Sequence, residues 1–293
     1  MLADQHIDLM IIGAQKAGTT SLLRYLGEHP QIAAHEALEF AFFLDEDEFQ
    51  IGFDKALIMY FGNIPKNKQK LVCKNAQQFA SEKAIQRLKE HNPNCKIVLS
   101  LRDPVSRTYS SYLMEKLYGR VDFEFDLLPE KLKNNALLDW QYEALISFSA
   151  YSDYLEILLK YFPKEQIRLV IFEEFAKDPL PVVREIFTDL NVNADFMPRI
   201  RDKHNETTMP RSKVYSGFLR RFLVEDNWFT RLLRKLLPGK IKAKLGMRMR
   251  NANKSGKSFP EISPAMRDYL RNFFAPSVQE LENKLNLNIR AWK

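Results

Sequence analysis

The sequence predicts an α/β fold in which a central parallel sheet is covered by helices. Short apolar runs have the length and composition of buried strands, and they lie at residues 7–12, 71–73, 96–101 and 167–172. Helical patterns lie around and between these runs, at residues 19–27, 81–91, 104–117, 152–161 and 181–190. Strands that alternate with helices favour a parallel sheet with both faces covered. We therefore expect three layers, with the sheet in the middle.

Proline and capping residues mark where the predicted helices begin and end. Prolines at positions 30, 93 and 163 follow helical patterns. Each marks the end of a helix, because the residue before a proline disfavours the helical conformation. Asp103 is a good N-cap and Pro104 a good first residue for the helix at 104–117. An amphipathic helix is also expected at 265–285, packed back on the core. The chain is expected to form one domain over residues 1–293.

Composition is that of an ordinary globular protein, with 45% hydrophobic and 28% charged residues. Apolar runs are much shorter than the roughly 20 residues of a membrane span. The N-terminus has acidic residues at Asp4 and Asp8 and enters its first strand almost at once, so we expect no basic, cleavable leader. Cys73 and Cys95 lack metal-type spacing, and we expect both to be buried structural residues of a reduced, cytoplasmic protein.

Positive charge is concentrated in residues 211–257, which contain fourteen Lys/Arg residues and two acidic residues. This gives +12 there and therefore −5 elsewhere in a chain whose total is +7. Apolar and basic residues alternate at helical spacing within 218–223 and 228–237, so a basic helical insertion is expected. It either covers the core with a solvated basic rim or binds a membrane surface or acidic partner. Nucleic-acid binding is not expected, because no recognised nucleic-acid module accompanies the charge.

The most informative stretch is the turn after the first predicted strand. The apolar run ends at Gly13, and Gly18 precedes the helix that starts at Thr19. A strand, a glycine turn and a helix start point several backbone N–H groups at one spot and add the positive end of a helix dipole. We expect this turn to bind a phosphate or a similar oxyanion. The predicted contacts are Gly13, Ala14, Gln15, Lys16, Ala17, Gly18, Thr19 and Thr20.

The lysine of this turn is not where a Walker loop has it. In that loop the lysine follows the second glycine, whereas Thr19 follows it here and Lys16 lies between the glycines. The anion is therefore expected to be held differently from the triphosphate of a magnesium-dependent NTPase. A glycine turn that binds nothing is the alternative, but such a turn requires neither Lys16 nor the threonine pair.

A second candidate anion site follows the strand at 96–101. Arg102 emerges where that strand ends, beside a helix N-terminus, and Ser110 lies two turns further along the helix. Ligands bind at the carboxyl ends of parallel strands in such sheets. An N-capped helix with Arg102 in a surface ion pair is the alternative for this stretch alone. Next to the first turn, the anion-binding interpretation is favoured.

Together the two stretches resemble a known family. The turn at 13–20 is similar to the 5′-phosphosulfate loop of sulfotransferases that use 3′-phosphoadenosine 5′-phosphosulfate (PAPS), and Arg102 with Ser110 resembles their 3′-phosphate site. Residues 29–32, 170–175 and 286–292 also look like that family. The similarity spans nearly the whole chain, and the residue pattern of the turn is typical of the branch with the heparan-sulfate enzymes and many bacterial proteins. It implies a P-loop-like fold.

The resemblance also implies a reaction and roles. A sulfuryl group would move from PAPS to an acceptor hydroxyl or amine, with no metal, and Lys16 would stabilise the leaving oxygen. The family's general base falls on Glu39, with Glu36 and His35 as nearby rivals, and Lys74 would line the acceptor site.

The acceptor side departs from the family pattern. The family often has lysine before this glutamate and histidine two residues after it, where this chain has Leu38 and Ala41. We therefore expect a small, lipid-linked or saccharide acceptor. Two alternatives stay open. One is a non-catalytic, membrane-associated nucleotide-binding module, which the segment 211–257 favours. The other is a magnesium-dependent P-loop kinase, in which Asp103 would imitate the metal-binding aspartate.

Overall fold

The computed structural model describes residues 5–35, 39–65, 67–200, 260–285, 289 and 292, and the backbone of 208–210 and 254–258. The chain groups into two compact units. The first comprises Met1–Arg107, Phe148–Arg201 and Phe274–Lys293, and the second comprises Thr108–Ser147 and Asp202–Phe273. The predicted helices of segment 211–257 lie outside the described residues. A single domain with a basic helical insertion therefore stays a prediction.

A five-stranded parallel sheet forms the centre of the first unit. Its strands are β1 (Leu9–Gly13), β2 (Ile32–Ala34), β3 (Lys70–Lys74), β4 (Lys96–Leu101) and β5 (Ile167–Ile171). They lie in the order β2-β3-β1-β4-β5, and each neighbouring pair is parallel. All carboxyl ends therefore meet at one edge, and the predicted α/β class with a parallel sheet is confirmed.

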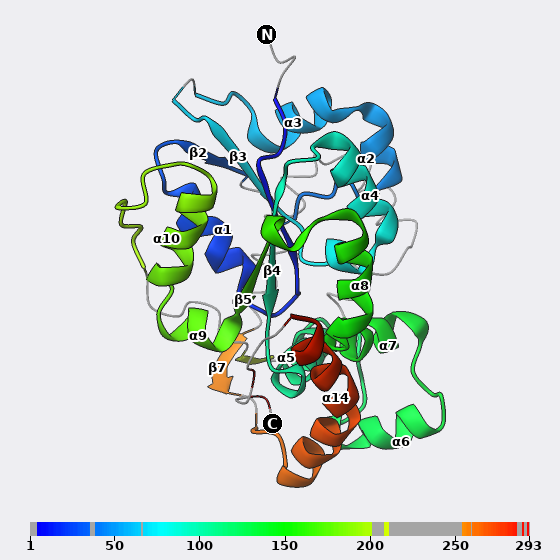
Figure 1. Cartoon of the computed structure of the whole chain (residues 1–293). Helices are drawn as coiled ribbons and strands as arrows, with labels where there is room; N and C mark the ends of the chain where they lie inside the picture. Colours follow the sequence, from blue (N-terminus) through cyan, green and yellow to red (C-terminus); the bar gives the residue numbers. More distant parts are fainter. Residues whose placement is uncertain are drawn as a thin grey trace. The chain divides into compact units, whose positions relative to one another are not determined.

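Helices of the first unit cover both faces of this sheet. They are α1 (Thr19–Gly27), α2 (Glu46–Ile51), α3 (Phe53–Phe61), α4 (Glu82–His91), α8 (Tyr151–Tyr161), α9 (Phe172–Lys177) and α10 (Leu180–Asp189). In Figure 1, α1 and α10 lie on one side of the sheet and α4 and α8 on the other, and contacts join the members of each pair. The three predicted layers are present.

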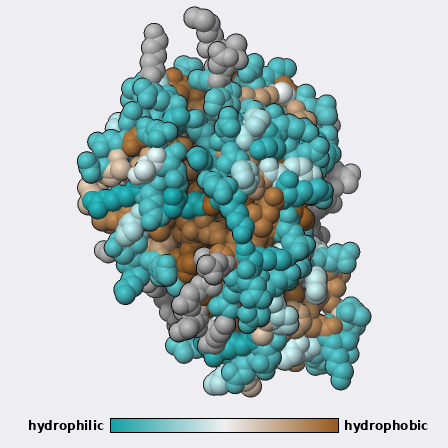
Figure 2. Space-filling view, viewed as in Figure 1, coloured by the Kyte–Doolittle hydropathy of each residue, from teal (hydrophilic) through white to brown (hydrophobic). Residues whose placement is uncertain are grey.

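The core between the sheet and its α1–α10 side follows from strand alternation. Leu9 and Ile11 of β1 point to that side, where they pack with Leu22 and Leu26 of α1 and with Phe187 of α10. Most of the surface drawn in Figure 2 is hydrophilic, with hydrophobic side chains gathered toward its middle. Cys73 and Cys95 are fully buried free thiols, as expected, and burial raises the pKa of both.

Predicted boundaries agree closely with the structure where capping signals are present. The predicted bounds of α1, β4 and α5 (Pro104–Leu117) are the observed ones, and Ser81 is the N-cap of α4 rather than its first residue. The strand predicted at 167–172 ends one residue early, because Phe172 begins α9.

The second unit contains most of α5, together with α6 (Leu128–Lys133) and α7 (Asp139–Leu145). Thr108 and Ser111 of α5 donate from their hydroxyl groups to the Leu145 and Ala144 carbonyl oxygens, at 2.9 Å each. The backbone of β6 (Thr208–Pro210) pairs antiparallel with β7 (Lys254–Ser258). Helix α14 (Pro264–Leu285) begins in this unit and ends in the first. None of the helices in the described part of the chain is long and apolar enough to span a membrane.

Candidate functional site

The turn between β1 and α1 has a backbone that the sequence only partly explains. Gly18 adopts φ +78°, a conformation suited to glycine. Lys16 adopts φ +74°, which costs an L-residue with a Cβ about 1–2 kcal/mol. Such strain persists where surrounding contacts hold the backbone, and it is frequent at ligand-binding sites. In this turn the contacts come from β4.

Ser100 of β4 forms two hydrogen bonds with the turn. The Ala14 N–H donates to the Ser100 carbonyl oxygen at 2.7 Å, and the Ser100 hydroxyl donates to the Ala17 carbonyl oxygen at 2.6 Å. Ser100 is buried. The Ala17 N–H donates to the Ala14 carbonyl oxygen at 3.2 Å, so two of the predicted anion donors are used within the protein itself. Ser100 was not predicted from the sequence, although a hydroxyl among the apolar residues 97–101 was an available signal.

The start of α1 offers N–H groups in the way an anion site requires. Its N-cap is Gly18, which has no side chain to accept from them, whereas Ser81 caps α4 with its hydroxyl. The first backbone bond of α1 runs from the Leu22 N–H to the Gly18 carbonyl oxygen at 3.1 Å. The N–H groups of Thr19 and Thr20 therefore belong to the first turn, which a helix cannot satisfy internally. An oxyanion at this point would accept hydrogen bonds from these N–H groups and interact favourably with the positive end of the helix dipole.

Arg102 brings the second predicted site into contact with the first. Its guanidinium Nη1 donates to the Lys16 carbonyl oxygen at 3.0 Å, and the guanidinium carbon lies 4.8 Å from the centre of the Phe172 ring. Burial lowers the pKa of Arg102, and the carboxylate of Glu173 opposes this effect. A Cβ placed on Gly18 would lie 2.9 Å from the Phe172 ring. The ends of β1, β4 and β5 thus meet in one cluster.

Asp103 and Ser110 complete the account of the second stretch. The Asp103 carboxylate accepts from the backbone N–H groups of Val105 (3.3 Å) and Ser106 (3.1 Å), so the predicted N-cap is confirmed. Ser110 is half-buried in the part of α5 that belongs to the second unit. Its role at a 3′-phosphate stays a prediction.

Glu39 and Lys74 form an ion pair at the same edge of the sheet. Lys74 ends β3 beside Ile11 of β1, and its Nζ donates to Glu39 Oε1 at 2.7 Å. The Ala76 N–H donates to Glu39 Oε2 at 2.9 Å. The side chain of Lys74 is 1% exposed and that of Glu39 is 35% exposed. Burial lowers the pKa of the Lys74 ammonium, and Glu39 opposes this effect. One carboxylate therefore reaches solvent while a buried cation holds it.

His35, one rival for the base, has a structural position. Its Nε2 accepts from the Lys74 backbone N–H at 3.0 Å, and the side chain is buried against the rings of Phe40 and Tyr60. Phe42 and Phe43 are buried as well, so the aromatic residues after Glu39 belong to the core. Glu36 and Leu38 lie outside the described residues. Among the candidates that the structure describes, Glu39 alone combines exposure with a place at this edge.

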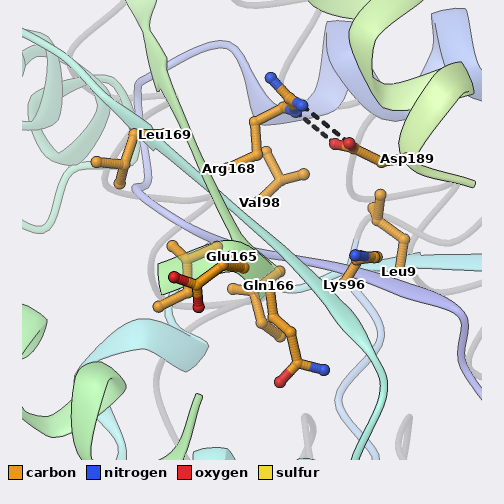
Figure 3. Close-up of a pocket in the computed structure, with 10 residues that line it drawn as sticks. Leu9, Lys96, Val98, Glu165, Gln166, Arg168, Leu169 and Asp189 are labelled. Carbon is orange, nitrogen blue, oxygen red and sulfur yellow. Dashed lines mark hydrogen bonds and ion pairs between the residues drawn. The ribbon is translucent and has the colours of Figure 1, made fainter. Parts of the chain in front are cut away.

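A cavity of about 180 Å³ lies at the opposite edge, at the amino ends of β1, β4 and β5 (Figure 3). Two of its charged groups, Arg168 and Asp189, contact each other at 2.5 and 2.9 Å, and Arg168 also contacts Glu185 at 2.5 Å. The cavity lies away from the candidate residues at the carboxyl ends of the strands. We therefore assign this cavity no part in the chemistry. Within the described residues there is also no group of three or more His, Cys, Asp or Glu side chains that could hold a metal ion.

The chain is similar in sequence to known proteins. The family model described as Sulfotransferase domain matches residues 6–214. The heparan sulfate glucosamine 3-O-sulfotransferase 5 proteins of Mus musculus and Homo sapiens are each 27% identical over 285 residues, which cover 95% of this chain and 72% of theirs. Heparan sulfate glucosamine 3-O-sulfotransferase 3B1 of Homo sapiens is 31% identical over 173 residues, 58% of this chain and 42% of its own.

A solved structure gives the same result for the fold. The sulfotransferase from Alicyclobacillus acidocaldarius aligns with a TM-score of 0.65 and 24% identity, and the alignment covers 98% of this chain and 99% of that one. This likeness concerns the fold, in which a parallel sheet flanked by helices carries a P-loop-like turn after its first strand.

Proposed function

We propose that this chain, which belongs to the sulfotransferase domain family, transfers a sulfuryl group from PAPS to the hydroxyl or amine of a small, lipid-linked or saccharide acceptor. One observation carries the proposal: Arg102 donates to the Lys16 carbonyl oxygen at 3.0 Å. Two cationic stretches that lie 86 residues apart in sequence are thereby neighbours at one sheet edge. A donor with an anionic group at each end of one nucleoside matches such a pair.

The turn at 13–20 would hold the phosphosulfate end of the donor. The N–H groups of Thr19 and Thr20, their hydroxyls and the positive end of α1 would bind its oxygens. The Gln15 side-chain oxygen is buried and, among the described residues, has no hydrogen-bond partner. The phosphosulfate oxygens only accept hydrogen bonds, so this oxygen would not be one of their contacts. Lys16 would place its ammonium on the bridging oxygen that gains charge as the S–O bond breaks.

Arg102 would hold the 3′-phosphate end. Its charge is partly buried, where an ionic hydrogen bond to phosphate is strong. The ring of Phe172 covers the guanidinium and would limit its movement. Ser110 belongs to the second unit, and its contact with this phosphate stays a prediction from the sequence. A 3′-phosphate separates PAPS from ATP and ADP, so Arg102 is the proposed selectivity residue.

Glu39 would act as the general base on the acceptor. Both of its oxygens already accept one hydrogen bond, but each carboxylate oxygen has two lone pairs. Glu39 would take the acceptor proton while the acceptor oxygen or nitrogen bonds to sulfur, and adenosine 3′,5′-bisphosphate would leave. Lys74 would keep the carboxylate oriented, because its ammonium is buried and points at Oε1.

A magnesium-dependent kinase is disfavoured by the position of Asp103. Its carboxylate caps α5, whereas a kinase of this kind uses the aspartate after the strand to hold the metal. For the acceptor, the relatives named above are heparan sulfate enzymes. Ala41 stands where the family often has histidine, and we therefore propose an acceptor other than a long, highly sulfated glycan.

Thermal shift and transfer assays test the proposal together. Adenosine 3′,5′-bisphosphate should raise the unfolding temperature without magnesium, while ADP and ATP should have little effect, because only a ligand that binds the folded state stabilises it. If ATP together with magnesium were the only condition that raised the unfolding temperature, this result would contradict the use of PAPS. Radiolabelled PAPS with a panel of alcohols, glycolipids and saccharides should then give a labelled product. Transfer to anionic polysaccharides alone would contradict the proposed acceptor class.

A further inference from the structure

Trp292, near the end of the sequence, is hydrogen-bonded to α9, the helix that follows β5. The Trp292 indole N–H donates to Glu173 Oε2 at 3.1 Å, and the two residues are 119 positions apart. The other oxygen of the same carboxylate accepts from the Asp103 backbone N–H at 3.0 Å. Trp292 is 4% exposed. One carboxylate therefore bridges a buried tryptophan and the backbone next to Arg102.

A second contact fixes the same turn from α8. The Tyr151 hydroxyl donates to the Arg102 carbonyl oxygen at 2.8 Å and accepts from the Arg102 N–H at 3.3 Å. The centres of the Tyr151 and Trp292 rings lie 6.1 Å apart, within the range of a favourable aromatic pair. The backbone of Arg102 is thus held by Tyr151, and that of Asp103 by Glu173. Trp292 contacts both of these side chains.

The Trp292 backbone is itself anchored. Its N–H donates to the Ile289 carbonyl oxygen at 2.9 Å, and the Ile289 N–H donates to Glu282 Oε1 on α14 at 3.3 Å. Ile289 is buried as well. The indole therefore reaches Glu173 from a fixed position, so it can restrict which way the carboxylate points.

We infer that Trp292 is a positioning residue that acts through Glu173 to hold the Arg102 guanidinium in place for the 3′-phosphate of the donor. This inference rests on the proposed use of PAPS. Without the indole N–H, Glu173 loses one of its two partners, and the turn at 102–103 gains freedom. The guanidinium then spends less time over Phe172 and beside Lys16. The protein should then bind the 3′-phosphate more weakly, whereas its binding of the 5′ end, which α1 holds, should not change.

Binding of two nucleotides separates this role from a merely structural one. The variant Trp292→Phe keeps an aromatic ring and removes the N–H. We expect its affinity for adenosine 3′,5′-bisphosphate to fall about five-fold, the effect of one hydrogen bond, with the affinity for adenosine 5′-monophosphate changed by less than about two-fold. The exposed Trp140 supplies the matched control, and Trp140→Phe should leave both affinities unchanged.

A double-mutant cycle tests the route through Glu173. Glu173→Gln keeps an oxygen for the Asp103 N–H but presents an N–H₂ group to the indole, so it should weaken bisphosphate binding by a similar factor. If Trp292 acts through Glu173, the double variant should lose little more than either single one. Additive losses would overturn the inference, as would an unchanged preference for the 3′-phosphate in Trp292→Phe. Equal weakening of both nucleotides would show a structural role only and would also overturn it. A wild-type protein without preference for the 3′-phosphate would instead refute the proposed function.

Discussion

Lys16 and Arg102 are two cations with separate proposed tasks that touch through a backbone atom. Arg102 donates to the Lys16 carbonyl oxygen, so the arginine helps to hold the turn whose lysine would stabilise the leaving group. Lys16 itself adopts φ +74°. A residue held in a costly conformation, with a charged neighbour fixed to its carbonyl group, is consistent with a site built before the ligand arrives.

Removal of the Lys16 ammonium should reduce turnover more than binding. We expect Lys16→Ala to lower kcat about 10²–10³-fold, because charge on the bridging oxygen develops only in the transition state. Alanine is the suitable replacement, since glycine would also release the backbone strain at φ +74°. Steady-state kinetics and bisphosphate affinity check this together. A near-normal kcat would exclude the leaving-group role.

Glu39→Gln should abolish proton removal while preserving donor binding. The amide is close in shape to the carboxylate but has no comparable basicity, so we expect kcat to fall about 10²–10⁴-fold. The exposed Glu165, at the opposite edge of the sheet, gives a control with the same loss of charge, and Glu165→Gln should be near normal. Equal kcat values for the two variants would remove Glu39 as the base.

The turn between β1 and α1 and the start of α9 approach so closely that only glycine fits at position 18. Gly18→Ala introduces a Cβ 2.9 Å from the ring of Phe172 in addition to the penalty of φ +78°. Gly52 has φ +87° and ψ 154°, a region that is essentially restricted to glycine, and a Cβ added there would have no neighbouring atom within 4 Å. Gly52→Ala therefore carries a conformational cost of about 1–3 kcal/mol without a close contact. Urea unfolding should show a loss of stability for both variants, whereas bisphosphate binding should weaken for Gly18→Ala alone. Equal bisphosphate affinities of the two variants would argue against the close packing at the turn.

Secondary structure was predictable where the sequence carries strong boundary signals. The bounds of β4 and α5 follow from an apolar run that ends in an N-cap aspartate and a proline. By contrast, β2 was missed because three residues are too short for a periodic pattern. Helix α2 was missed although Asp45 caps it by accepting from the Glu48 N–H, a signal that the sequence contained.

The candidate site was predictable only in its local parts. The turn at 13–20, Arg102 and Glu39 all follow strands or lie in recognisable patterns. Ser100, Tyr151, Glu173 and Trp292 were missed because their partners lie 49 to 119 residues away in sequence. No local periodicity encodes such contacts. The Glu39–Lys74 pair is intermediate, since both residues were predicted as site residues but their contact was not.

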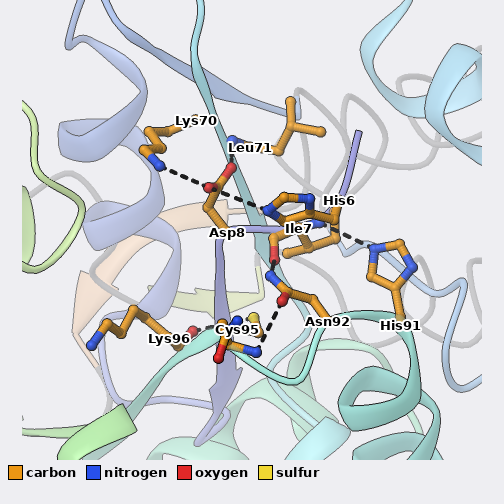
Figure 4. A network of polar contacts seen from close by, with 10 residues as sticks. His6, Ile7, Asp8, Lys70, Leu71, His91, Asn92, Cys95 and Lys96 are labelled. Atoms are coloured by element: carbon orange, nitrogen blue, oxygen red, sulfur yellow. Dashed lines mark hydrogen bonds and ion pairs between the residues drawn. The ribbon is translucent and has the colours of Figure 1, made fainter. Parts of the chain in front are cut away.

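The first unit uses the two edges of its sheet differently. The carboxyl edge collects Lys16, Arg102, Glu39 and Lys74, whereas the amino edge carries a network of structural contacts (Figure 4). There, Asp8 accepts from Lys70 Nζ at 3.0 Å and from the Leu71 N–H at 2.8 Å. The proposed chemistry at one edge is thus separated from the structural contacts at the other, and the two should respond to different changes.

Protonation of His91 at the amino edge should destabilise the protein in acid. His91 Nε2 accepts from the Ile7 N–H at 3.1 Å (Figure 4), which requires the neutral ring, and burial lowers the pKa of His91 from 6.5 to about 4. The unfolded chain therefore binds this proton first. Neutral His91 contributes to the free energy of unfolding fully above about pH 6.5, and this contribution is lost as the pH falls toward about 4. The loss should be about 2–3 kcal/mol after a discount for partial exposure.

The variant His91→Gln checks this pH dependence. Glutamine still offers an acceptor to the Ile7 N–H but does not titrate, so the difference in stability between about pH 7 and about pH 4.5 should shrink. Urea unfolding at both pH values measures it. A wild-type protein and a variant with the same pH dependence would show that another group dominates.

The account depends most on a single ligand that spans the Lys16 turn and Arg102. Isothermal titration with adenosine 3′,5′-bisphosphate and adenosine 5′-monophosphate tests this on the wild type and on Arg102→Ala, with the exposed Arg184 changed to Ala as the control. We expect the wild type and Arg184→Ala to bind the bisphosphate at least about ten-fold more tightly, as a charged hydrogen bond to phosphate implies. Arg102→Ala should bind the two nucleotides alike. A preference for the bisphosphate that survives in Arg102→Ala would contradict the account.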